Sequence, residues 1–376
     1  MGENNNYINL EYYPFTELFN DKTSGNKKIK QSDYIVTGKI PIIDQGQKLI
    51  GGYSNDITCL ANVNLPCIIF GDHTRIFKYI DFPFAIGADG VKILVPIKDI
   101  CVKYVYYFLN QVKLAGKIGY NRNFKYLKEV KIPLPDLPTQ IRIDTELEKV
   151  DKAREKRRKA LALTDQYLQS AFLDMFGDPV RNEKGWEVKK LEDLCEQISD
   201  CPHSTPIHQD NQTNYPCIRT TDMKDGYIVW DRMKYVDYKS YLERTKRLTP
   251  ETGDIVFARE GNFGEAVRIP SEFNFCLGQR TLLFRPKLET CNSEFLWYLI
   301  RSDGIYLQAK NNTSGSTVSH INVKDMKKFE GYCPPRYLQQ QFASLVEKTE
   351  KLRARQKESE KQLDALFTSL MQKYFG

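Results

Sequence analysis

The chain has 376 residues, which is too long for one ordinary domain, so two or three domains are expected. Its hydrophobic fraction of 41% is enough to fill their cores, and its formal net charge of +7 favours a polyanionic partner without proving one. No window approaches roughly 18 uninterrupted apolar residues, which excludes an evident membrane-spanning helix, and residues 1–9 are too polar for a signal peptide. A soluble protein of the cytoplasm is therefore expected, with no membrane partner.

The nine cysteines are scattered along the chain without a CxxC pair, so reduced thiols buried in the core are expected. Cys195, Cys201, His203 and His208 are the residues that could form a zinc site. Their spacings match no standard zinc site, so the sequence predicts no bound metal.

Residues 1–134 contain short apolar runs separated by turn residues, a pattern typical of strands. Leu65 to Phe70 and Phe82 to Gly87 are two such runs, and Tyr104 to Leu109 is a further apolar run. The pattern predicts a mixed α/β module of ordinary domain size.

The next stretch, Pro135 to Gly177, is predicted to form one long helix. Steps of four and three residues give a heptad seam that is apolar at both ends and arginine-rich in the middle: Ile143, Leu147, Val150, Arg154, Arg157, Leu161, Thr164, Leu168, Ala171 and Met175. At about 1.5 Å per residue, a helix from Leu137 to Met175 is a rod of about 57 Å. Gly177, followed by Asp178-Pro179, ends it, and the pattern favours a coiled-coil spacer.

The chain contains this helix twice. Phe176-Gly177 recurs at Phe375-Gly376, an offset of 199 residues (177 to 376). The same offset places similar segments together: Leu147 to Arg154 on Val346 to Arg353, Gln140 on Gln339, Asp165 on Asp364, Asn123 on Asn322, Lys125 on Lys324 and Lys128 on Lys327. Helix composition alone would not keep this register over so long a stretch, so we interpret the chain as an internal duplication.

The runs before each helix also resemble one another. Leu65 to Phe70 is similar to Thr252 to Phe257, and Phe82 to Gly87 is similar to Phe273 to Gly278. The predicted organisation is a first module, a spacer helix, a second module and a second spacer helix: residues 1–134, 135–177, 178–333 and 334–376.

The connectivity predicts how the two helices pair. The second module begins where the first helix ends, so the second helix must run antiparallel to the first if their seams pack together. We expect an α+β fold with two mixed α/β modules at opposite ends of an antiparallel two-helix coiled coil, related by a pseudo-two-fold axis. We predict that Arg154 and Arg157 set the register of the coiled coil. They should lie near Lys357 and Ala354, with Glu358 and Glu360 as their charge partners.

A duplicated chain of this kind resembles the specificity subunit of type I restriction–modification systems. The resemblance covers essentially the whole chain and is carried by four phrases in order: the helix start IPLP…Q…L..VD, YPCIRTTDM (215–223), GDIVFAREGNFG (253–264) and GSTVSHINVKDMKKF (315–329). In the first module the equivalent of the GSTVSH loop is residues 116–121, which lacks the hydroxyl cluster.

The resemblance implies that each module is a target-recognition domain for one half of a bipartite double-stranded DNA site. It further implies that the helices set the spacing and dock two adenine-N6 methyltransferase subunits, with restriction and translocase subunits joining the complex. S-adenosylmethionine and ATP are then expected on those partners, and no cofactor on this chain. The protein is expected to be prokaryotic.

Side chains that read base edges or contact phosphates are Arg, Lys, Asn, Gln, Ser, Thr and His in exposed loops. Candidates for DNA contact in the first module are Gln45, Gln47, His73, Thr74, Arg75, Asn121, Arg122 and Asn123. Candidates in the second module are His203, Ser204, Thr205, Arg219, Thr220, Thr221, Arg259, Asn262, Gln279, Arg280, Ser314, Ser316, Thr317, Ser319 and His320. The open alternatives are an ordinary turn for the serine-rich loop, a surface Arg–Glu pair for Arg259 and a solvated strand edge at Gln279-Arg280.

Several catalytic motifs are missing from the sequence. The one Pro-Pro, at Pro334-Pro335, lacks the flanking residues of an adenine methyltransferase motif, and no GxxxxGK[ST] phosphate-binding loop is present. The sequence therefore predicts a non-catalytic subunit. Two alternatives stay open: a coiled-coil scaffold whose modules bind protein, and an enzyme of the fused restriction–methylation class.

Overall fold

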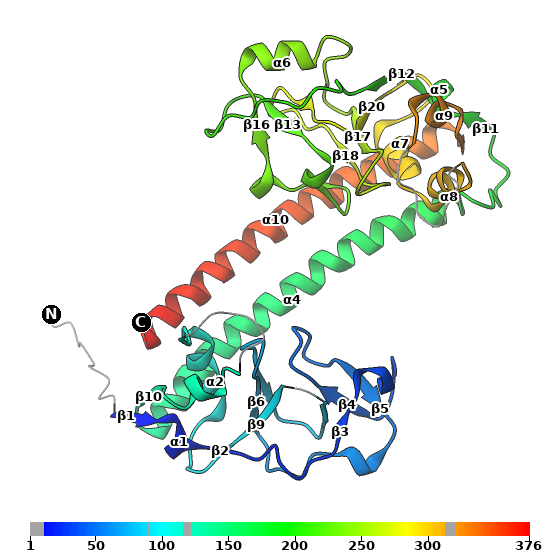
Figure 1. Cartoon of the computed structure of the whole chain (residues 1–376). Coiled ribbons are helices and arrows are strands. Elements are labelled where there is room, and N and C mark those ends of the chain that lie inside the picture. Colours follow the sequence, from blue (N-terminus) through cyan, green and yellow to red (C-terminus); the bar gives the residue numbers. More distant parts are fainter. Residues whose placement is uncertain (1–10, 89, 116–121, 313–320) are drawn as a thin grey trace. The chain divides into compact units, whose positions relative to one another are not determined.

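The chain forms two compact units, as seen in a computed structural model that describes residues 11–88, 90–115, 122–312 and 321–376. Unit 1 comprises residues 1–158 and 358–376, and unit 2 comprises residues 159–357. Each unit has a globular part and one half of each long helix, α4 (Leu137–Phe176) and α10 (Arg336–Phe375) (Figure 1). The structure thus confirms the two predicted long helices, each of which has 40 residues.

The globular part of unit 1 alternates short strands with short helices. Its elements are β1 (Glu11–Pro14), α1 (Phe15–Leu18), β2 (Phe19–Asp21), β3 (Lys28–Ile29), β4 (Ile40–Ile43), β5 (Gly52–Ser54), β6 (Cys67–Gly71), β7 (Phe77–Ile80), β8 (Ala85–Gly87), β9 (Val91–Pro96), α2 (Val102–Gln111), α3 (Phe124–Leu127) and β10 (Lys131–Leu134). The strands form an antiparallel sheet of order β2-β9-β6-β7, a mixed sheet of order β3-β8-β4-β5 and the pair β1-β10.

The globular part of unit 2 repeats this plan. Its elements are β11 (Val188–Lys190), α5 (Leu191–Leu194), β12 (Cys195–Asp200), β13 (Pro216–Ile218), β14 (Met223–Lys224), β15 (Tyr227–Ile228), β16 (Lys234–Tyr235), α6 (Tyr238–Arg244), β17 (Ile255–Ala258), β18 (Ala266–Arg268), β19 (Cys276–Leu277), β20 (Thr281–Pro286), α7 (Ser293–Ile300), α8 (Asp303–Asn311), α9 (Val323–Lys328) and β21 (Glu330–Tyr332). Its sheets have the orders β12-β20-β17-β18 and β16-β13-β19, with the pairs β11-β21 and β14-β15. The runs that resemble each other in sequence, β6 and β17 or β8 and β19, occupy equivalent strands.

The central strand of each unit explains why its sequence is apolar without alternation. Ile68 and Phe70 of β6 pack in the core shared with the long helices, whereas Cys67 and Ile69 pack in a second core on the other face of the sheet. Strand β17 does the same with Phe257 on one face and Val256 on the other. A strand that is buried on both faces is expected to lack a polar side.

A buried glutamine joins each long helix to its own globular part. Gln140 accepts a hydrogen bond from the Cys101 backbone N–H at 3.0 Å and donates one to the Pro135 carbonyl at 2.8 Å. Gln339 makes the equivalent bonds to the backbone N–H of Asn292 at 2.7 Å and to the carbonyl of Pro334 at 2.8 Å. The duplicated glutamine thus fixes the beginning of each helix in the same way.

The two helices pair antiparallel within each unit, but the predicted register was wrong. In unit 1 Arg154 binds Asp364, with 2.5 Å between Nε and Oδ1, and its Cζ lies 4.3 Å from the ring centre of Phe367. Asp364 lies seven residues, one heptad, beyond the predicted neighbour Lys357. A heptad seam is unchanged by a shift of seven residues, so the seam alone does not fix the register.

The other residues that were predicted to set the register also have partners that differ from the prediction. Glu360 pairs with Arg158 at 3.2 Å rather than with Arg154 or Arg157. Glu358 accepts a hydrogen bond from Gln362 on its own helix at 3.4 Å. Among the described residues of this pairing, Arg157 contributes no ion pair.

The duplication accounts for the observed register. In unit 2 Arg353 binds Asp165, with 3.0 Å between Nε and Oδ1. Arg353 and Asp364 lie 199 residues after Arg154 and Asp165, respectively. The same arginine–aspartate pair is therefore formed once in each unit, and the roles of α4 and α10 are exchanged between the two.

We expect Arg154 and Asp364 to be energetically coupled. Replacing Arg154 with Glu should lower the free energy of unfolding, and the double variant Arg154→Glu/Asp364→Arg should recover about 1 kcal/mol of the loss. Denaturant unfolding of the two single variants and the double variant measures this coupling. The exposed pair Lys351–Glu347 is the control, with a coupling below about 0.5 kcal/mol. Strictly additive effects at Arg154 and Asp364 would contradict the register.

Candidate nucleic-acid interface

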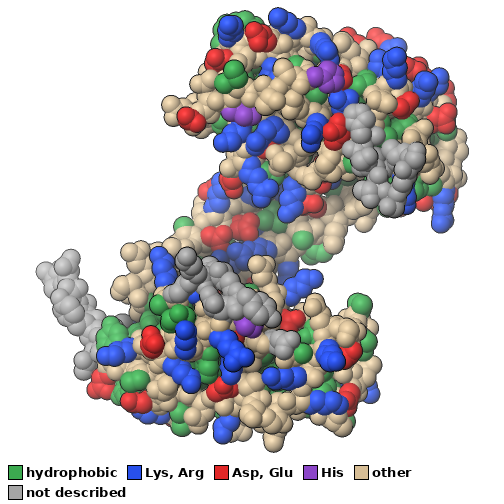
Figure 2. All heavy atoms as spheres, in the orientation of Figure 1, with side chains coloured by type: hydrophobic (Ala, Val, Ile, Leu, Met, Phe, Trp, Pro, Cys, Tyr) green, Lys and Arg blue, Asp and Glu red, His purple; other side chains and the backbone are tan. Residues whose placement is uncertain are grey.

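A basic groove of about 800 Å³ lies on the globular part of unit 1. Cationic side chains dominate its lining: Lys28, Lys92, Arg122, Lys125 and Lys128. Figure 2 shows Lys and Arg side chains gathered on the face of this unit that the view presents. Clustered cations in a groove are the electrostatic footprint expected for a phosphate backbone.

An aromatic ring holds two of these cations beside the groove. The ammonium nitrogens of Lys92 and Lys128 lie 4.9 and 5.0 Å from the centre of the Phe124 ring. Lys92 also pairs with Asp21 at 2.9 Å. Cations placed over a ring lose less side-chain freedom when an anion binds, which favours tight contact with phosphate.

The turn between β6 and β7 holds the segment that carries Arg122 and Lys125. The Asp72 carboxylate accepts a hydrogen bond from the Phe124 backbone N–H at 2.7 Å, and the Asn123 side chain donates to the Asp72 carbonyl at 2.7 Å. Arg75 donates from Nε to Asn123 Oδ1 at 3.0 Å. Arg75 and Asn123, both predicted to contact DNA, are thus engaged in holding the groove wall together.

Three further predicted residues meet at the edge of this groove. Gln45 Oε1 accepts a hydrogen bond from the His73 backbone N–H at 3.3 Å, and the Thr74 hydroxyl donates to the Gln45 carbonyl at 2.7 Å. Gly90 has a φ of 65°, and a Cβ there would lie 2.5 Å from Gln45 Oε1 and 2.7 Å from the His73 ring. A larger residue at this φ would be strained and would displace the side chains of Gln45 and His73. Gln47 is exposed on the same loop as Gln45.

A buried lysine holds the loop that carries Gln45 and Gln47. Lys78 is 4% exposed, and its ammonium donates to the carbonyls of Asp44 at 2.7 Å and Lys48 at 2.6 Å. Burial lowers the pKa of Lys78, while the Asp44 carboxylate opposes this shift. Because its charge is balanced by carbonyls and one carboxylate, Lys78 organises the loop of Gln45 and Gln47 rather than facing solvent.

In unit 2 two predicted residues, His203 and Arg259, contact Asp200, and the Arg280 carbonyl accepts the Arg259 backbone N–H at 3.1 Å. His203 Nε2 lies 3.2 Å from one carboxylate oxygen of Asp200, and Arg259 lies 3.5 Å from the other. Gln279 donates to the His203 carbonyl at 2.6 Å, and Arg280 pairs with Glu260 at 3.1 Å. His203 and Arg280 are exposed, whereas Arg259 is buried.

A second group of predicted residues lies around the turn after β13. Arg219 forms two hydrogen bonds to the buried Asp222 carboxylate, at 2.9 and 2.6 Å, and a third to the Arg232 carbonyl at 2.6 Å. Asn262 donates to the Thr220 carbonyl at 3.3 Å. The guanidinium of Arg219 therefore has a structural role, while Thr220 and the exposed Asn262 keep polar atoms at the surface.

Arg244 of α6 is a buried cation that donates to loop carbonyls in unit 2, as Lys78 does in unit 1. It is 5% exposed and donates to the carbonyls of Leu277 at 2.6 Å, Ser204 at 3.0 Å and Pro202 at 3.4 Å. These bonds join the loop of His203, Ser204 and Thr205 to the segment before Gln279. Arg244 thereby positions two candidate reading loops with one buried cation.

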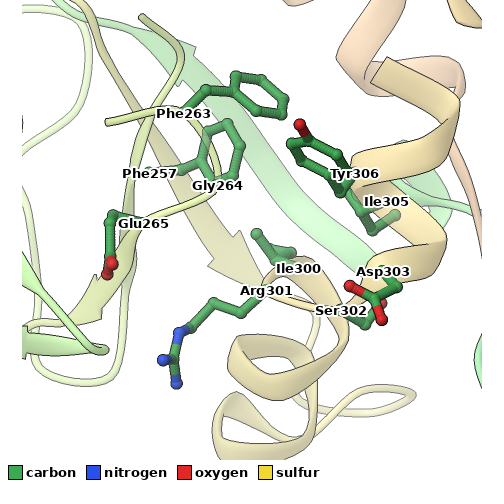
Figure 3. A pocket seen from close by; sticks show the side chains of 10 residues that line it. All are labelled: Phe257, Phe263, Gly264, Glu265, Ile300, Arg301, Ser302, Asp303, Ile305 and Tyr306. Carbon is green, nitrogen blue, oxygen red and sulfur yellow. The ribbon is translucent and has the colours of Figure 1, made fainter. Parts of the chain in front are cut away.

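Unit 2 also contains a pocket of about 230 Å³ between the β17–β18 turn and the junction of α7 and α8. Figure 3 shows the rings of Phe257, Phe263 and Tyr306 at one end of it, with the side chains of Glu265 and Arg301 directed away from them. The rings of Phe263 and Tyr306 are 6.0 Å apart. The lining of this pocket holds one cation, Arg301, beside the carboxylates Glu265 and Asp303, so the pocket is less cationic than the unit 1 groove.

Some predicted residues are not placed by the structure. Six lie outside the described residues: Asn121, Ser314, Ser316, Thr317, Ser319 and His320. Ser204, Thr205 and Thr221 are described and exposed, and the Thr221 hydroxyl donates to Asp222 Oδ1 at 3.3 Å.

The described residues can be compared with the predictions for cysteines, metal sites and membrane-spanning helices. There the cysteines are all free thiols, and Cys195 and Cys201 are buried. Across residues 11–88, 90–115, 122–312 and 321–376, no group of three or more His, Cys, Asp or Glu side chains is arranged to hold a metal ion. No helix within those ranges is long and apolar enough to cross a membrane.

Comparison with known proteins places this architecture in a family. The sequence model described as the type I restriction modification DNA specificity domain matches residues 8–163 and 183–364. The chain belongs to this DNA specificity family. The family model matches twice, once over each half, so the chain holds two specificity domains and the predicted role in DNA sequence specificity is confirmed.

Individual members of the specificity family agree with this assignment. The specificity subunit of the type I restriction enzyme EcoR124I/EcoR124II from Escherichia coli is 23% identical over 364 residues, which cover 92% of this chain and 88% of that protein. The S subunit of a type I restriction–modification system from M. genitalium has a similar fold, with a TM-score of 0.62, 16% identity and coverage of 100% of this chain and 98% of that chain. A chain from a structure of type I system assembly and conformational transition gives a TM-score of 0.50 at 16% identity, covering 97% of each chain. The predicted α+β fold class of two mixed domains joined by a coiled coil is thus confirmed.

In a DNA specificity chain, the groove lysines are candidate functional residues that the sequence reasoning missed. Lys28, Lys92, Lys125 and Lys128 line the groove, yet only their neighbours Arg122 and His73 were predicted. A signal was present for two of them, because Lys125 and Lys128 recur at Lys324 and Lys327 in the duplication. Lysine is common on every surface, so this recurrence has meaning only beside a groove.

Proposed function

We propose that this chain selects a bipartite double-stranded DNA site, one half through each globular domain, for partner methyltransferase and restriction subunits. Residues 1–134 and 178–333 are the recognition domains, and residues 135–177 and 334–376 are the spacer helices. Chemistry then belongs to partners that hold S-adenosylmethionine and ATP, and this chain contributes sequence recognition without catalysis.

The observation that carries this proposal is the basic groove of unit 1 together with its organised edge. Lys125 and Lys128 supply charge for the phosphate backbone, while His73 of the groove lining and Gln45 at its edge, whose Oε1 accepts the His73 backbone N–H, are the candidates for base edges. This division between positioning contacts and reading contacts is typical of sequence-specific DNA binding.

In unit 2 the reading role falls to the loops that Arg244 joins. His203, Gln279 and Arg280 lie within one hydrogen-bonded cluster, and Asn262 lies on the adjacent turn. Arginine, glutamine and asparagine form the commonest base-specific contacts in the major groove. Arg219, Arg259, Arg75 and Asn123 stay in the proposal as weaker candidates, because their polar groups are already engaged inside the fold.

Exposed apolar residues on the long helices support docking of protein partners. Tyr167 of α4 and Leu366 of α10 are 54% and 47% exposed, and they occupy corresponding positions of the duplication. Each unit therefore exposes one member of this matched pair. A partner that docks on such a residue would bind twice per chain, which favours two methyltransferase subunits.

A gel-shift titration tests the proposal against its two rivals. With a methyltransferase partner of this family present, the chain should shift a duplex that carries its site in preference to a scrambled duplex, and the shift should weaken steeply with salt. A protein scaffold would shift neither duplex at low salt. Methyl transfer by the isolated chain would contradict the non-catalytic part of the proposal and favour the fused enzyme.

A further inference from the structure

Tyr227 connects a hairpin of the unit 2 globular part to both long helices. Its hydroxyl donates to Asp165 of α4 at 3.1 Å, and the guanidinium carbon of Arg353 of α10 lies 3.5 Å from the centre of its ring. Arg353 in turn donates to the same Asp165 carboxylate at 3.0 Å. One tyrosine therefore completes the arginine–aspartate pair that joins α4 to α10.

The contact is partly shielded from water, with the Asp165 side chain 39% exposed. The side chain of Arg353 is 14% exposed, and burial raises the pKa of the Tyr227 hydroxyl to about 12. Tyr227 thus stays protonated and able to donate throughout the physiological pH range. Cation–ring and charge-assisted hydrogen bonds are stronger when they are shielded in this way.

The hairpin that carries Tyr227 is itself fixed. Gly226 precedes it with a φ of 85° and donates its backbone N–H to Glu265 at 3.2 Å. A Cβ at Gly226 would lie 2.5 Å from the Arg301 guanidinium and 2.8 Å from the Trp297 ring. Glu265 and Arg301 lie in the wall of the unit 2 pocket (Figure 3). The turn is therefore held on two sides, and Tyr227 transmits that rigidity to the helices.

A second attachment lies further along α4. Phe172 and Phe176 pack in the main core of unit 2 together with Phe342 of α10. Asp165 and Phe176 are eleven residues apart in the sequence, or about 16 Å along the helix axis. A domain attached to a helix at two such points resists rotation about either one. Arg268 of β18 also pairs with Glu350 of α10, with 2.7 Å between Nη2 and Oε2. Tyr227 therefore acts together with this ion pair and the aromatic core in determining the angle of the domain on its helices.

In unit 1 a different ring packs on the equivalent arginine–aspartate pair. Arg154 occupies the position of Arg353 in the duplication, but its guanidinium packs on Phe367, which belongs to α10 itself. The arginine–aspartate pair of unit 1 is therefore completed by a helix residue, whereas in unit 2 a residue of the recognition domain takes that place.

We propose that Tyr227 is a positioning residue that fixes the unit 2 recognition domain on the spacer helices and thereby sets the selectivity for gap length between the two half-sites. This inference rests on the proposed bipartite function. Reading two half-sites on one duplex requires a fixed distance and rotation between the readers, because each added base pair rotates the next half-site around the DNA axis. Among the described residues, the side-chain partners of Tyr227 include Asp165, Arg353 and Trp297, none of which is a candidate reading residue. A change at Tyr227 should therefore affect the gap and leave the half-site sequences unchanged.

The test measures methylation of plasmids whose half-sites are separated by the natural gap or by one base pair more or fewer, using the full complex. In Tyr227→Leu the ratio of natural-gap to altered-gap methylation should fall about tenfold, with both half-site sequences retained. The half-buried Tyr235→Leu, in a core of the globular part, is the matched control and should keep the wild-type ratio. An unchanged ratio in folded Tyr227→Leu overturns the inference.

A milder variant decides the matter if Tyr227→Leu does not fold. Tyr227→Phe keeps the ring beneath Arg353 and removes only the hydrogen bond to Asp165, so the ratio should fall by roughly threefold. The wild-type ratio in Tyr227→Phe would then overturn the inference. Failure of the proposed function would give a different result, because the wild-type complex would then methylate no bipartite site.

Discussion

Replacing Lys125 and Lys128 with Ala should weaken DNA binding strongly and should also flatten its salt dependence. Each lost phosphate contact reduces the magnitude of the slope of log affinity against log salt by about 0.9. The slope of the double variant should therefore be about 1.8 smaller in magnitude than that of the wild type. Over the roughly 0.8 decades between 0.15 M and 1 M salt, this difference amounts to about 30-fold in affinity at 0.15 M. Titrations of cognate and scrambled duplexes at several salt concentrations measure both quantities.

The control is a pair of lysines of equal charge on the same unit. Lys98 and Lys131 are exposed and do not line the groove, so Lys98→Ala/Lys131→Ala should leave the slope nearly unchanged. The preference for cognate over scrambled DNA should persist in the Lys125/Lys128 variant, because phosphate contacts carry little sequence information. Equal slopes for the two double variants would remove the groove from the interface.

The sequence predicted the fold well because the duplication imposed long-range constraints. Gln140 and Gln339 recur at one offset, and both occupy the same helix junction. The register failed because a heptad seam tolerates a shift of seven residues. The pairs Arg154–Asp364 and Arg353–Asp165 were nevertheless implicit in the repeat, since exchanging the two halves converts one pair into the other.

The interface was predicted less well than the fold for a different physical reason. An arginine in a loop has the same sequence signature whether it faces solvent or an internal carboxylate. Arg219 was selected for base reading, but the buried Asp222 engages its guanidinium. Lys92 was not selected, although Phe124 holds it beside the groove. Only the three-dimensional partners of each side chain separate these cases.

Exchanging residues 178–333 for the corresponding domain of another family member should change one half of the recognised site and leave the other half unchanged. The junctions suit such an exchange, because α4 ends at Phe176 and α10 begins at Arg336. The incoming domain must still accept Phe172 and Phe342 in its core and offer a hydroxyl to the Gly177 carbonyl, which Tyr332 binds at 3.0 Å. A domain with a tyrosine at that position is therefore the preferred donor.

The most direct test maps adenine methylation across the genome of a host that expresses this chain with its methyltransferase partner, alongside a second host that carries the 178–333 exchange. We predict a bipartite motif with a fixed gap in the first host and a motif with one altered half in the second. A continuous motif, no motif, or simultaneous change of both halves would contradict the account.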